Sequence, residues 1–547
     1  ISERDIRTTY DGDGRWAYAT IDSAHLKEVQ WKGYTIKDIY AINTHTGEKR
    51  IVQNKWKGNL LSPNYSDSKL VYYDEPSRKY FSYDANSNRS FVIAKDIKWS
   101  FFDEDNDVPD DPNAYGIAKW MEDQRHLIIY DRYDLWLVDA DGIEPSKLLT
   151  NGRAIKTVYR FNETISDRKF LNNNALILLR GYNEVSKSES LSSLLINTRT
   201  LTLLNQFPMH LSNIVAAKES SDFIALQEDE KSAANIFVYK LNTNAQAPVA
   251  LTAINPQQAE YNWLSSEIVK WKSYTGKITE GVLYKPENFD PKKKYPMIVY
   301  FYERNNQTLH NYIPPAPTGS RLNISFFASR GYLVFVPDIW YTKGYPGQSA
   351  YDYIVSGTKA MIQKGFVDST KIGLQGQSWG GYQIAYLITK TNMYAAAWAG
   401  APVVNMTSAY GGIRWGPGMN RQFQYEKTQS RIGATLWEKP NLYIENSALF
   451  HLPKVTTPLV IMANDADDAV PWYQGIEFYT AMRRLGKKVW MLNYNNEAHN
   501  LVERKNRKDI QIREQQFFDY LLKGEKPAPW IANGVPATMK GRDWGLK

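Results

Sequence analysis

The hydrophobic pattern of the chain changes near residue 263, and this change constrains the fold more than any other feature. Up to about residue 260, short segments of alternating apolar and polar residues are separated by polar turns, with hardly a convincing helix. Such alternation is typical of half-buried strands. After residue 263, nearly continuous apolar segments alternate with stretches of helical length, as in a parallel sheet covered on both faces. The sequence therefore predicts two domains, over residues 1–262 and 263–547.

One local pattern recurs in the first domain: an apolar strand, then Asn or Asp, then a small polar turn. The marker residues of this pattern are Asn43, Asp84, Asp139, Asn197 and Asn242. Four-stranded units at this spacing are typical of β-propeller blades, and an irregular β-sandwich is the alternative. About five blade-like units are few for a propeller, and the chain starts at Ile1, so we expect the propeller to be incomplete at its N-terminal side. The acidic segment 103–111 lacks the spacing and glycine of an EF-hand, which favours a solvated loop over a calcium site.

The second domain is predicted to be an α/β hydrolase domain with a doubly wound, mostly parallel sheet. Its expected strands are Pro296–Tyr302, Tyr332–Val336, Lys371–Gln375, Pro458–Ala463 and Lys488–Tyr494. Helical periodicity is found over Ile476–Leu485 and Ile510–Leu522.

The most specific motif is Gly376-Gln377-Ser378-Trp379-Gly380-Gly381, between the strand ending at Gln375 and a helical run from Tyr382. A serine between glycines at a strand-to-helix turn is the pattern of a nucleophile elbow. The turn is so tight that side chains at the glycine positions would clash, and it exposes the serine hydroxyl at a helix N-terminus. The alternative is a glycine-rich turn whose serine only caps the helix.

A serine nucleophile needs a base and an orienting carboxylate, which follow it in the chain in α/β hydrolases. Only His451 and His499 lie downstream of Ser378. His451 lies in an apolar stretch and is interpreted as structural, whereas His499 lies in a loop just past a predicted strand. For the carboxylate, Asp465, Asp467 and Asp468 all follow the strand Pro458–Ala463, and spacing alone does not choose among them.

Composition excludes several other functions. The chain has no cysteine, which rules out disulfides, thiolate catalysis and Cys-ligated metals. The longest nearly apolar stretch, Ala395–Val404, is far shorter than the roughly 20 residues of a membrane-spanning helix. The net charge of +8 is spread over interleaved basic and acidic residues, so no nucleic-acid partner is expected. Histidines are too scattered for a zinc cluster, and neither a metal nor an organic cofactor is predicted.

Together, the segments Gly376–Tyr382 and Ala466–Val470 and the loop holding His499 resemble the prolyl oligopeptidase family of serine peptidases, especially its dipeptidyl-peptidase and acylaminoacyl-peptidase branches in secreted bacterial members. The resemblance covers roughly 265–547 and extends to the preceding propeller, which in this family sits over the active site. It implies that Asp467, the first residue of the Asp-Asp pair, orients His499. It also implies a peptide substrate and a periplasmic or secreted location.

The same resemblance implies an oxyanion hole formed by the Tyr302 hydroxyl and the backbone N–H of Trp379. Val403, Tyr410 and Val470 are the residues expected at the substrate pocket. The chain departs from the family where proline-cleaving members have a second tyrosine after Tyr410, since a Gly-rich segment follows here. Ala469 stands where the family often has Asn or Arg. The preferred residue at the cleavage site and the release of dipeptides are therefore not predicted.

The expected function is a serine peptidase that hydrolyses oligopeptides through Ser378, Asp467 and His499, with the propeller gating access. The alternatives are an esterase or acyl-peptide hydrolase with the same triad, and a propeller scaffold without activity. A homodimer is left open.

Overall fold

A computed structural model describes residues 5–66, 68–162, 169–217, 220, 222–240 and 247–546. The chain divides into two compact units. The first comprises Ile1–Asn106, Asp110–Asp229 and Ala234–Ile254, and the second Asp107–Pro109, Glu230–Ala233 and Asn255–Lys547. The second unit contains the continuous segment Asn255–Lys547. The side chains of Asn255 and Gln258 both hydrogen-bond the hydroxyl of Tyr312, which attaches residues 255–262 to the second unit.

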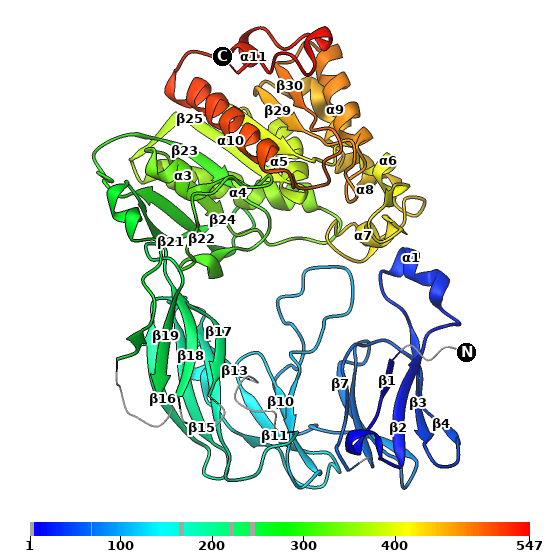
Figure 1. The fold of residues 1–547 in the computed structure, drawn as a ribbon. Coiled ribbons are helices and arrows are strands. Elements are labelled where there is room, and N and C mark those ends of the chain that lie inside the picture. Colours follow the sequence, from blue (N-terminus) through cyan, green and yellow to red (C-terminus); the bar gives the residue numbers. More distant parts are fainter. Residues whose placement is uncertain are drawn as a thin grey trace. The chain divides into compact units, whose positions relative to one another are not determined.

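The described part of the first unit forms five four-stranded sheets that follow one another along the chain (Figure 1). The first contains β1 (Asp5–Arg7), β2 (Trp16–Ile21), β3 (Lys37–Asn43) and β4 (Lys49–Trp56). The second contains β5 (Leu61–Pro63), β6 (Lys69–Asp74), β7 (Lys79–Asp84) and β8 (Arg89–Val92). The third contains β9 (Ile117–Trp120), β10 (His126–Tyr130), β11 (Leu135–Asp139) and β12 (Lys147–Leu148). The fourth contains β13 (Thr157–Phe161), β14 (Leu176–Asn183), β15 (Glu189–Leu195) and β16 (Thr200–Phe207). The fifth contains β17 (His210–Ala216), β18 (Asp222–Glu228), β19 (Asn235–Lys240) and β20 (Val249–Ala250). Consecutive strands pair antiparallel within each sheet, and the short helices α1 (Val29–Lys32) and α2 (Gly152–Ile155) lie between strands.

Asn43, Asp84 and Asp139 are the last residues of the third strands of their sheets, and Asn197 lies two residues beyond the third strand β15. Asn43 accepts hydrogen bonds from the backbone N–H groups of His45 and Thr46, and Asp84 accepts them from those of Asn86 and Ser87. Asn and Asp recur here because their short side chains cap the turn into the fourth strand. Asp139 and Asn197 bind following backbone amides in the same way. Asn242 lies outside the described residues.

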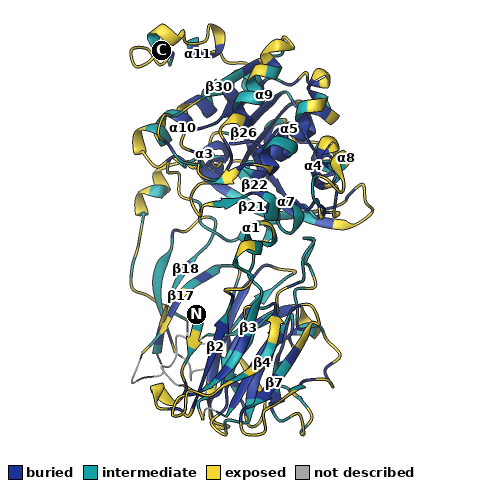
Figure 2. Ribbon diagram, turned by 90° about the vertical axis from the view of Figure 1, so that its right-hand side faces the viewer, coloured by how far each residue is buried: buried dark blue, intermediate teal, exposed yellow. Residues whose placement is uncertain are grey.

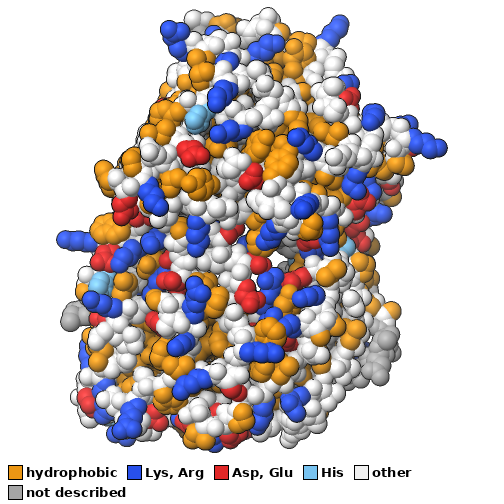
Figure 3. Space-filling model, turned by 180° about the vertical axis from the view of Figure 1, so that it is seen from behind, with side chains coloured by type: hydrophobic (Ala, Val, Ile, Leu, Met, Phe, Trp, Pro, Cys, Tyr) orange, Lys and Arg blue, Asp and Glu red, His pale blue; other side chains and the backbone are white. Residues whose placement is uncertain are grey.

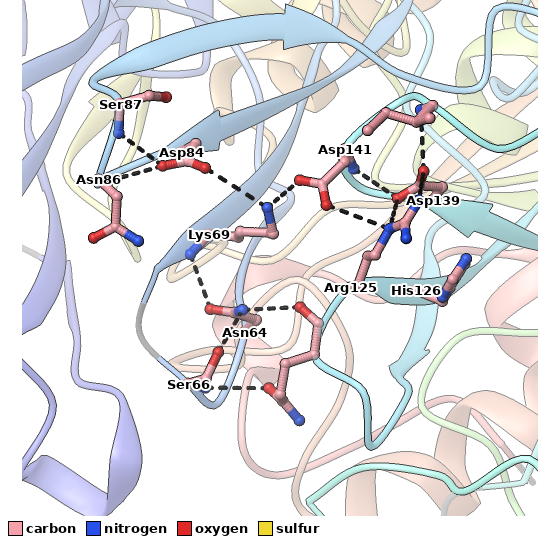
Figure 4. A network of polar contacts seen from close by, with 12 residues as sticks. Asn64, Ser66, Lys69, Asp84, Asn86, Ser87, Arg125, His126, Asp139 and Asp141 are labelled. Atoms are coloured by element: carbon pink, nitrogen blue, oxygen red, sulfur yellow. Dashed lines mark hydrogen bonds and ion pairs between the residues drawn. The ribbon is translucent and has the colours of Figure 1, made fainter.

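Ion pairs link the second and third sheets. Lys69 on β6 contacts Asp84 of its own sheet and Asp141, which follows β11 of the next sheet (Figure 4). Arg125 in turn binds Asp139 and Asp141. Because Lys69 is buried, removing its carboxylate partners would leave an uncompensated charge in the protein interior.

The acidic segment 103–111 differs from the solvated loop expected from the sequence. Asp110 and Asp111 both contact the Nζ of Lys57, at 2.5 and 2.9 Å. Asp105 contacts Arg132, at 2.9 Å. These aspartates are partly buried, so basic partners rather than water compensate their charge.

The second unit is built on an eight-stranded sheet of order β21-β22-β24-β23-β25-β26-β29-β30. Its strands are β21 (Leu264–Lys272), β22 (Ile278–Pro286), β23 (Tyr295–Tyr300), β24 (Leu333–Pro337), β25 (Val367–Gln377), β26 (Ala396–Gly400), β29 (Leu459–Met462) and β30 (Val489–Leu492). The first two pairings are antiparallel and all later ones are parallel. A short hairpin, β27 (Ile413–Arg414) and β28 (Met419–Asn420), lies apart from this sheet.

Helices cover both faces of this sheet, which creates two separate cores. The helices are α3 (Ile324–Ser329), α4 (Pro346–Gln363), α5 (Trp379–Lys390), α6 (Met406–Tyr410), α7 (Gln422–Glu426), α8 (Pro440–Glu445), α9 (Tyr473–Arg484), α10 (Arg504–Phe518) and α11 (Pro529–Ala532). Along β23, Met297 and Val299 join the core that includes residues of α4, α5 and α9, whereas Ile298 joins the core that includes α3 and α10. Both faces of the strand are therefore buried, which explains its continuous apolar run (Figure 2).

Figure 3 shows basic and acidic side chains interspersed over the face in view. None of the helices among the described residues has the length and apolar character needed to span a membrane.

An isolated carboxyl group lies in the interior of the second unit. Glu514 on α10 is buried against the sheet, where its side chain meets that of Gln375 on β25. Burial raises the pKa of Glu514 to about 8, although the hydrogen bond with Gln375 opposes the shift. The folded protein therefore holds this group neutral at pH values where the unfolded chain would ionise it.

We predict that Glu514→Gln makes the protein relatively more stable as the pH rises. Below about pH 4.5, Glu514 is protonated in both the folded and unfolded states, so its titration contributes nothing to the difference from the variant. Between pH 4.5 and 8, the wild type loses about 1.4 kcal/mol of unfolding free energy per pH unit through this group, because only the folded state keeps the proton. Glutamine does not ionise and escapes this loss. Urea denaturation at several pH values measures the difference, with the exposed Glu525→Gln as control. A difference between Glu514→Gln and wild type that stays constant with pH would contradict the prediction.

Candidate active site

Ser378 occupies the turn between β25 and α5. Strand β25 ends at Gln377 and α5 begins at Trp379, so Ser378 precedes the helix directly. Its backbone has φ 61° and ψ −111°, a conformation that residues with a Cβ atom rarely adopt. The N–H of Ser378 donates to the carbonyl oxygen of Gly400 on β26, at 2.7 Å. The neighbouring strand therefore holds the strained residue in place.

Two glycines make this turn possible. A Cβ atom at Gly376 would lie 2.8 Å from the carbonyl carbon of Gly380, and one at Gly380 would lie 2.6 Å from the carbonyl oxygen of Phe301. Both distances are shorter than side chains tolerate. The glycines expected from the sequence motif are thus required by the approach of helix α5 to strands β23 and β25.

His499 and Asp467 lie in contact. His499 Nδ1 lies 2.8 Å from Asp467 Oδ2, and the other carboxylate oxygen of Asp467 accepts hydrogen bonds from the N–H groups of Ala469 and Val470. Asp467 is buried and is therefore fixed at the ring nitrogen. Of the three aspartates that the sequence left open, Asp465 instead binds Asn495 and Asn496.

Side-chain amides connect the loops that carry these residues. Asn464 donates to the carbonyl oxygen of Ala498, which joins the loop after β29 to the loop after β30. Gln377 donates to the carbonyl oxygen of His499, at 2.8 Å, which joins the latter loop to the turn at Ser378. Glu497 accepts hydrogen bonds from the N–H groups of Val502 and Glu503 and so closes the loop before α10. His451, by contrast, lies in the short 3₁₀ helix Ala448–Lys454 and not in a loop at the end of a strand.

Tyr302, two residues beyond β23, is oriented at both its backbone and its hydroxyl group. Gln383 on α5 donates to the carbonyl oxygen of Tyr302 at 2.8 Å. Gln429 donates to the Tyr302 hydroxyl oxygen at 2.9 Å. Because the hydroxyl oxygen accepts this hydrogen bond, its own proton remains available to a third group.

A cavity of about 490 Å³ in the second unit brings several predicted residues together. Tyr302, Ser378, Val470 and His499 all line it. A narrower adjoining recess, also lined by Ser378 and Val470, adds Trp379 and Val403. Asp467 lies behind His499 rather than in the cavity lining.

Tyr410 does not line either cavity, unlike the expectation that it forms part of the substrate pocket. Its ring is buried against Tyr425, Trp437 and Tyr443, and its hydroxyl donates to Glu426 at 2.6 Å. One ring of this cluster, Tyr425, lines the narrower recess together with Ser378.

The segment 411–431 supplies pocket residues that sequence reasoning missed. They are Arg414, Arg421, Phe423, Gln424, Tyr425, Thr428, Gln429 and Ser430. The only available signal was that a Gly-rich segment replaces the expected second tyrosine, which marks a different pocket wall without showing which side chains point inward. Burial lowers the pKa of Arg414, and the positive charge of Arg421 lowers it further. One wall of the pocket is therefore polar and cationic.

No cluster of three or more histidine, aspartate or glutamate side chains suited to a metal ion occurs among the residues that the structure describes. The arrangement around Ser378 instead offers a hydroxyl group, an imidazole in contact with a carboxylate, and a phenol. These are the groups required for acyl transfer to a serine.

We predict that Gly380→Ala destabilises the protein by about 1–3 kcal/mol, because the added methyl group meets the carbonyl oxygen of Phe301 in a packed turn. Urea unfolding measures the change. Gly411→Ala is the matched control, since its added Cβ atom would lie 3.9 Å from the carbonyl oxygen of Ser408, an ordinary van der Waals distance. Equal unfolding midpoints for the two variants would refute the clash.

A sequence model of the prolyl oligopeptidase family matches residues 318–525. Among curated relatives, dipeptidyl-peptidase 5 of Porphyromonas endodontalis is 26% identical over 276 residues, covering 46% of this chain and 36% of the relative. The acylamino-acid-releasing enzyme of Rattus norvegicus is 25% identical over 230 residues, covering 41% of this chain and 31% of the relative. The region of the chain that matches these relatives covers about a third of the length of each of them.

Solved structures share the fold over nearly the whole chain. Dipeptidyl peptidase 4 of Porphyromonas gingivalis has a TM-score of 0.66 at 15% identity, covering 94% of this chain and 74% of that one. A puromycin-hydrolysing peptidase of Mycobacterium tuberculosis has a TM-score of 0.62 at 15% identity, covering 96% and 80%. The segment 318–525, which holds Ser378 and His499, therefore matches the sequence model of the prolyl oligopeptidase family, and the solved structures share the fold of the chain.

Proposed function

We propose that this protein is a serine peptidase that hydrolyses peptide bonds of oligopeptides. The observation that carries the proposal is the cavity that Ser378, His499 and Tyr302 line together, with Asp467 in contact with the histidine. These groups occupy the ends of different strands of one sheet, where hydrolases of this architecture assemble their chemistry.

In the proposed first step, His499 Nε2 takes the proton of the Ser378 hydroxyl while the serine oxygen attacks the carbonyl carbon of the substrate. Asp467 accepts the hydrogen bond from Nδ1–H, which keeps Nε2 unprotonated before the attack and stabilises the imidazolium afterwards. The contact of 2.8 Å between Nδ1 and Oδ2 supports this role. The backbone amides of Ala469 and Val470 hold the second oxygen of the carboxylate and prevent it from rotating away.

We propose that the Tyr302 hydroxyl and the N–H of Trp379 donate hydrogen bonds to the negatively charged oxygen of the substrate. Trp379 is the first residue of α5, where N–H groups lack intrahelical acceptors and the helix dipole favours an anion. Gln429 orients the Tyr302 hydroxyl by donating to its oxygen, which leaves the proton for the oxyanion. The imidazolium then protonates the leaving amine, and water activated by His499 releases the acyl group from Ser378.

The proposal extends to the first unit, whose five described sheets we propose to form a β-propeller that restricts large polypeptides. A periplasmic or secreted location is part of the same proposal, based on the family resemblance. The relatives include both dipeptidyl peptidases and acylamino-acid-releasing enzymes. Because of the acylamino-acid-releasing enzymes among the relatives, the second candidate function is that of an acyl-peptide hydrolase. Turnover of peptides with free and with acetylated N-termini separates the two.

We predict that a fluorophosphonate probe labels wild-type protein at Ser378, because a serine activated by an imidazole attacks the phosphorus centre. Ser378→Ala should abolish labelling, and Asp467→Asn should slow it strongly without changing the fold. Peptide mass mapping of the labelled protein identifies the site. Folded protein that remains unlabelled would overturn the proposed function.

We further predict that Tyr302→Phe lowers kcat by about 10²–10³-fold with little change in KM, because the hydroxyl acts on charge that develops only in the transition state. Steady-state kinetics with an oligopeptide substrate provide the measurement. Tyr345→Phe, at an exposed tyrosine outside the cavity lining, is the control. An unchanged kcat in Tyr302→Phe would remove this residue from the oxyanion hole.

A further inference from the structure

A buried arginine without a carboxylate partner lies beside Ser378. Arg421 has 1% of its surface exposed and lines the narrow recess together with Ser378, Trp379 and Val403. Its Nε has no hydrogen-bond partner, and Arg421 forms no salt bridge with any residue that the structure describes. One of its terminal nitrogens donates to the carbonyl oxygen of Ala469. A buried cation with a free donor is costly unless a negative charge compensates it.

The other buried arginines of the second unit have carboxylate partners that compensate their charge. Arg431, 3% exposed, pairs with Asp107 and Glu303. Arg513, 6% exposed, pairs with Asp509. Arg421 is more deeply buried than either and lacks the equivalent acid, so its position in a recess next to the serine distinguishes it from a structural arginine.

The neighbouring side chains reinforce the cationic character of this wall. Arg414 lines the larger cavity and donates to the Oε1 of Gln424, which itself lines both cavities. The nearby acid Asp467 is already engaged by His499 and by two backbone amides. Asp468 also attracts Arg414 electrostatically, but Arg421 forms no salt bridge with any acid among the described residues.

The size of the recess limits what enters it. Its volume of about 10 Å³ is room for roughly one water-sized group. An aromatic side chain does not fit, whereas one oxygen of a carboxylate does, with the rest of the carboxylate and its aliphatic stem in the larger cavity near Val470. Arginine suits such a carboxylate oxygen because the hydrogen bond between them is charge-assisted.

We propose that Arg421 selects peptide substrates in which the residue that supplies the attacked carbonyl group is aspartate or glutamate. The carboxylate would bind the guanidinium of Arg421, with Arg414 adding long-range attraction. This inference rests on the proposed peptidase function and names its substrate class. It makes Arg421 a specificity-determining residue, in addition to its hydrogen bond with the loop behind Asp467.

The test compares substrates that differ only at the residue before a common aminomethylcoumarin leaving group: Glu, Asp, Gln, Asn and Ala. Each is made with a free and with an acetylated N-terminus, so that the result does not depend on the mode of N-terminal recognition. We expect kcat/KM for Glu or Asp to exceed that for the matching amide by about 10- to 100-fold, the ratio that one charge-assisted hydrogen bond supplies. Equal or faster turnover of the Gln and Ala substrates would overturn the inference, with or without any variant.

Variants then separate selection from a structural role. In Arg421→Gln, the Glu/Gln ratio should fall to about one, whereas Arg421→Lys should retain part of it. Arg513→Gln, which removes another buried arginine far along the chain on α10, should keep the wild-type ratio. A purely structural role of Arg421 would lower turnover of all substrates equally and leave the ratio unchanged, which would refute the inference.

A second arm identifies the source of the carboxylate. Peptides with Ala at the cleavage position are compared with free and with amidated C-termini. A strong preference for the free C-terminus, together with no preference for Glu over Gln, would assign Arg421 to a terminal carboxylate and overturn the side-chain proposal. Failure of the peptidase function itself would look different, because no substrate would be cleaved and the fluorophosphonate probe would not label Ser378.

Discussion

The strained backbone at Ser378 is the constraint on which the candidate site depends. A residue with a Cβ atom at φ 61° persists only where its surroundings leave no alternative. Here the Ser378 N–H is bound to Gly400 on the adjacent strand, and helix α5 approaches the sheet within distances that only glycine permits at residues 376 and 380. The central strands are fully buried between helices, so their packing stabilises a turn that would otherwise relax.

The parallel sheet brings the other groups to the same edge. Strands β23, β25, β29 and β30 run parallel to their neighbours, and Tyr302, Ser378, Asp467 and His499 all follow their C-terminal ends. Buried side-chain amides then fix the loops relative to one another: Asn464 binds the loop of His499, and Gln377 binds the His499 carbonyl. The precision of the site thus comes from a second set of polar contacts that takes no part in the proposed chemistry.

Charge is distributed unevenly around this site. Around His499, the available carboxylate is satisfied on both oxygens, whereas the wall formed by residues 411–431 carries two arginines without acidic partners among the described residues. Asp467 and Asp468 act on Arg414 through their charges, but neither Arg414 nor Arg421 forms a salt bridge with an acid among the described residues. Elsewhere the chain compensates its buried ions, as between Lys57 and Asp110 or between Arg431 and Glu303. This contrast directs attention to the substrate as the missing anion.

Several features of the protein were set by local sequence. The recurring Asn or Asp residues indicated where the third strand of a sheet ends, because these side chains cap turns formed by residues close in the chain. The glycines around Ser378 likewise predicted the strand-to-helix turn, because the turn is formed by residues that are neighbours in the chain. The continuous apolar runs indicated strands buried on both faces, since covering both faces removes the need for polar alternation.

Tertiary structure decided what depends on groups distant in the chain. Three aspartates followed one strand, and only the packing of the loops placed Asp467 rather than Asp465 against the imidazole. The sequence did not show that the ring of Tyr410 packs against Tyr443, or that Arg421 lines the recess beside Ser378. Sequence determines local turns and periodic burial because these depend on neighbouring residues. The direction in which a side chain points at the end of a long loop depends on the whole packed interior, and that was settled only in three dimensions.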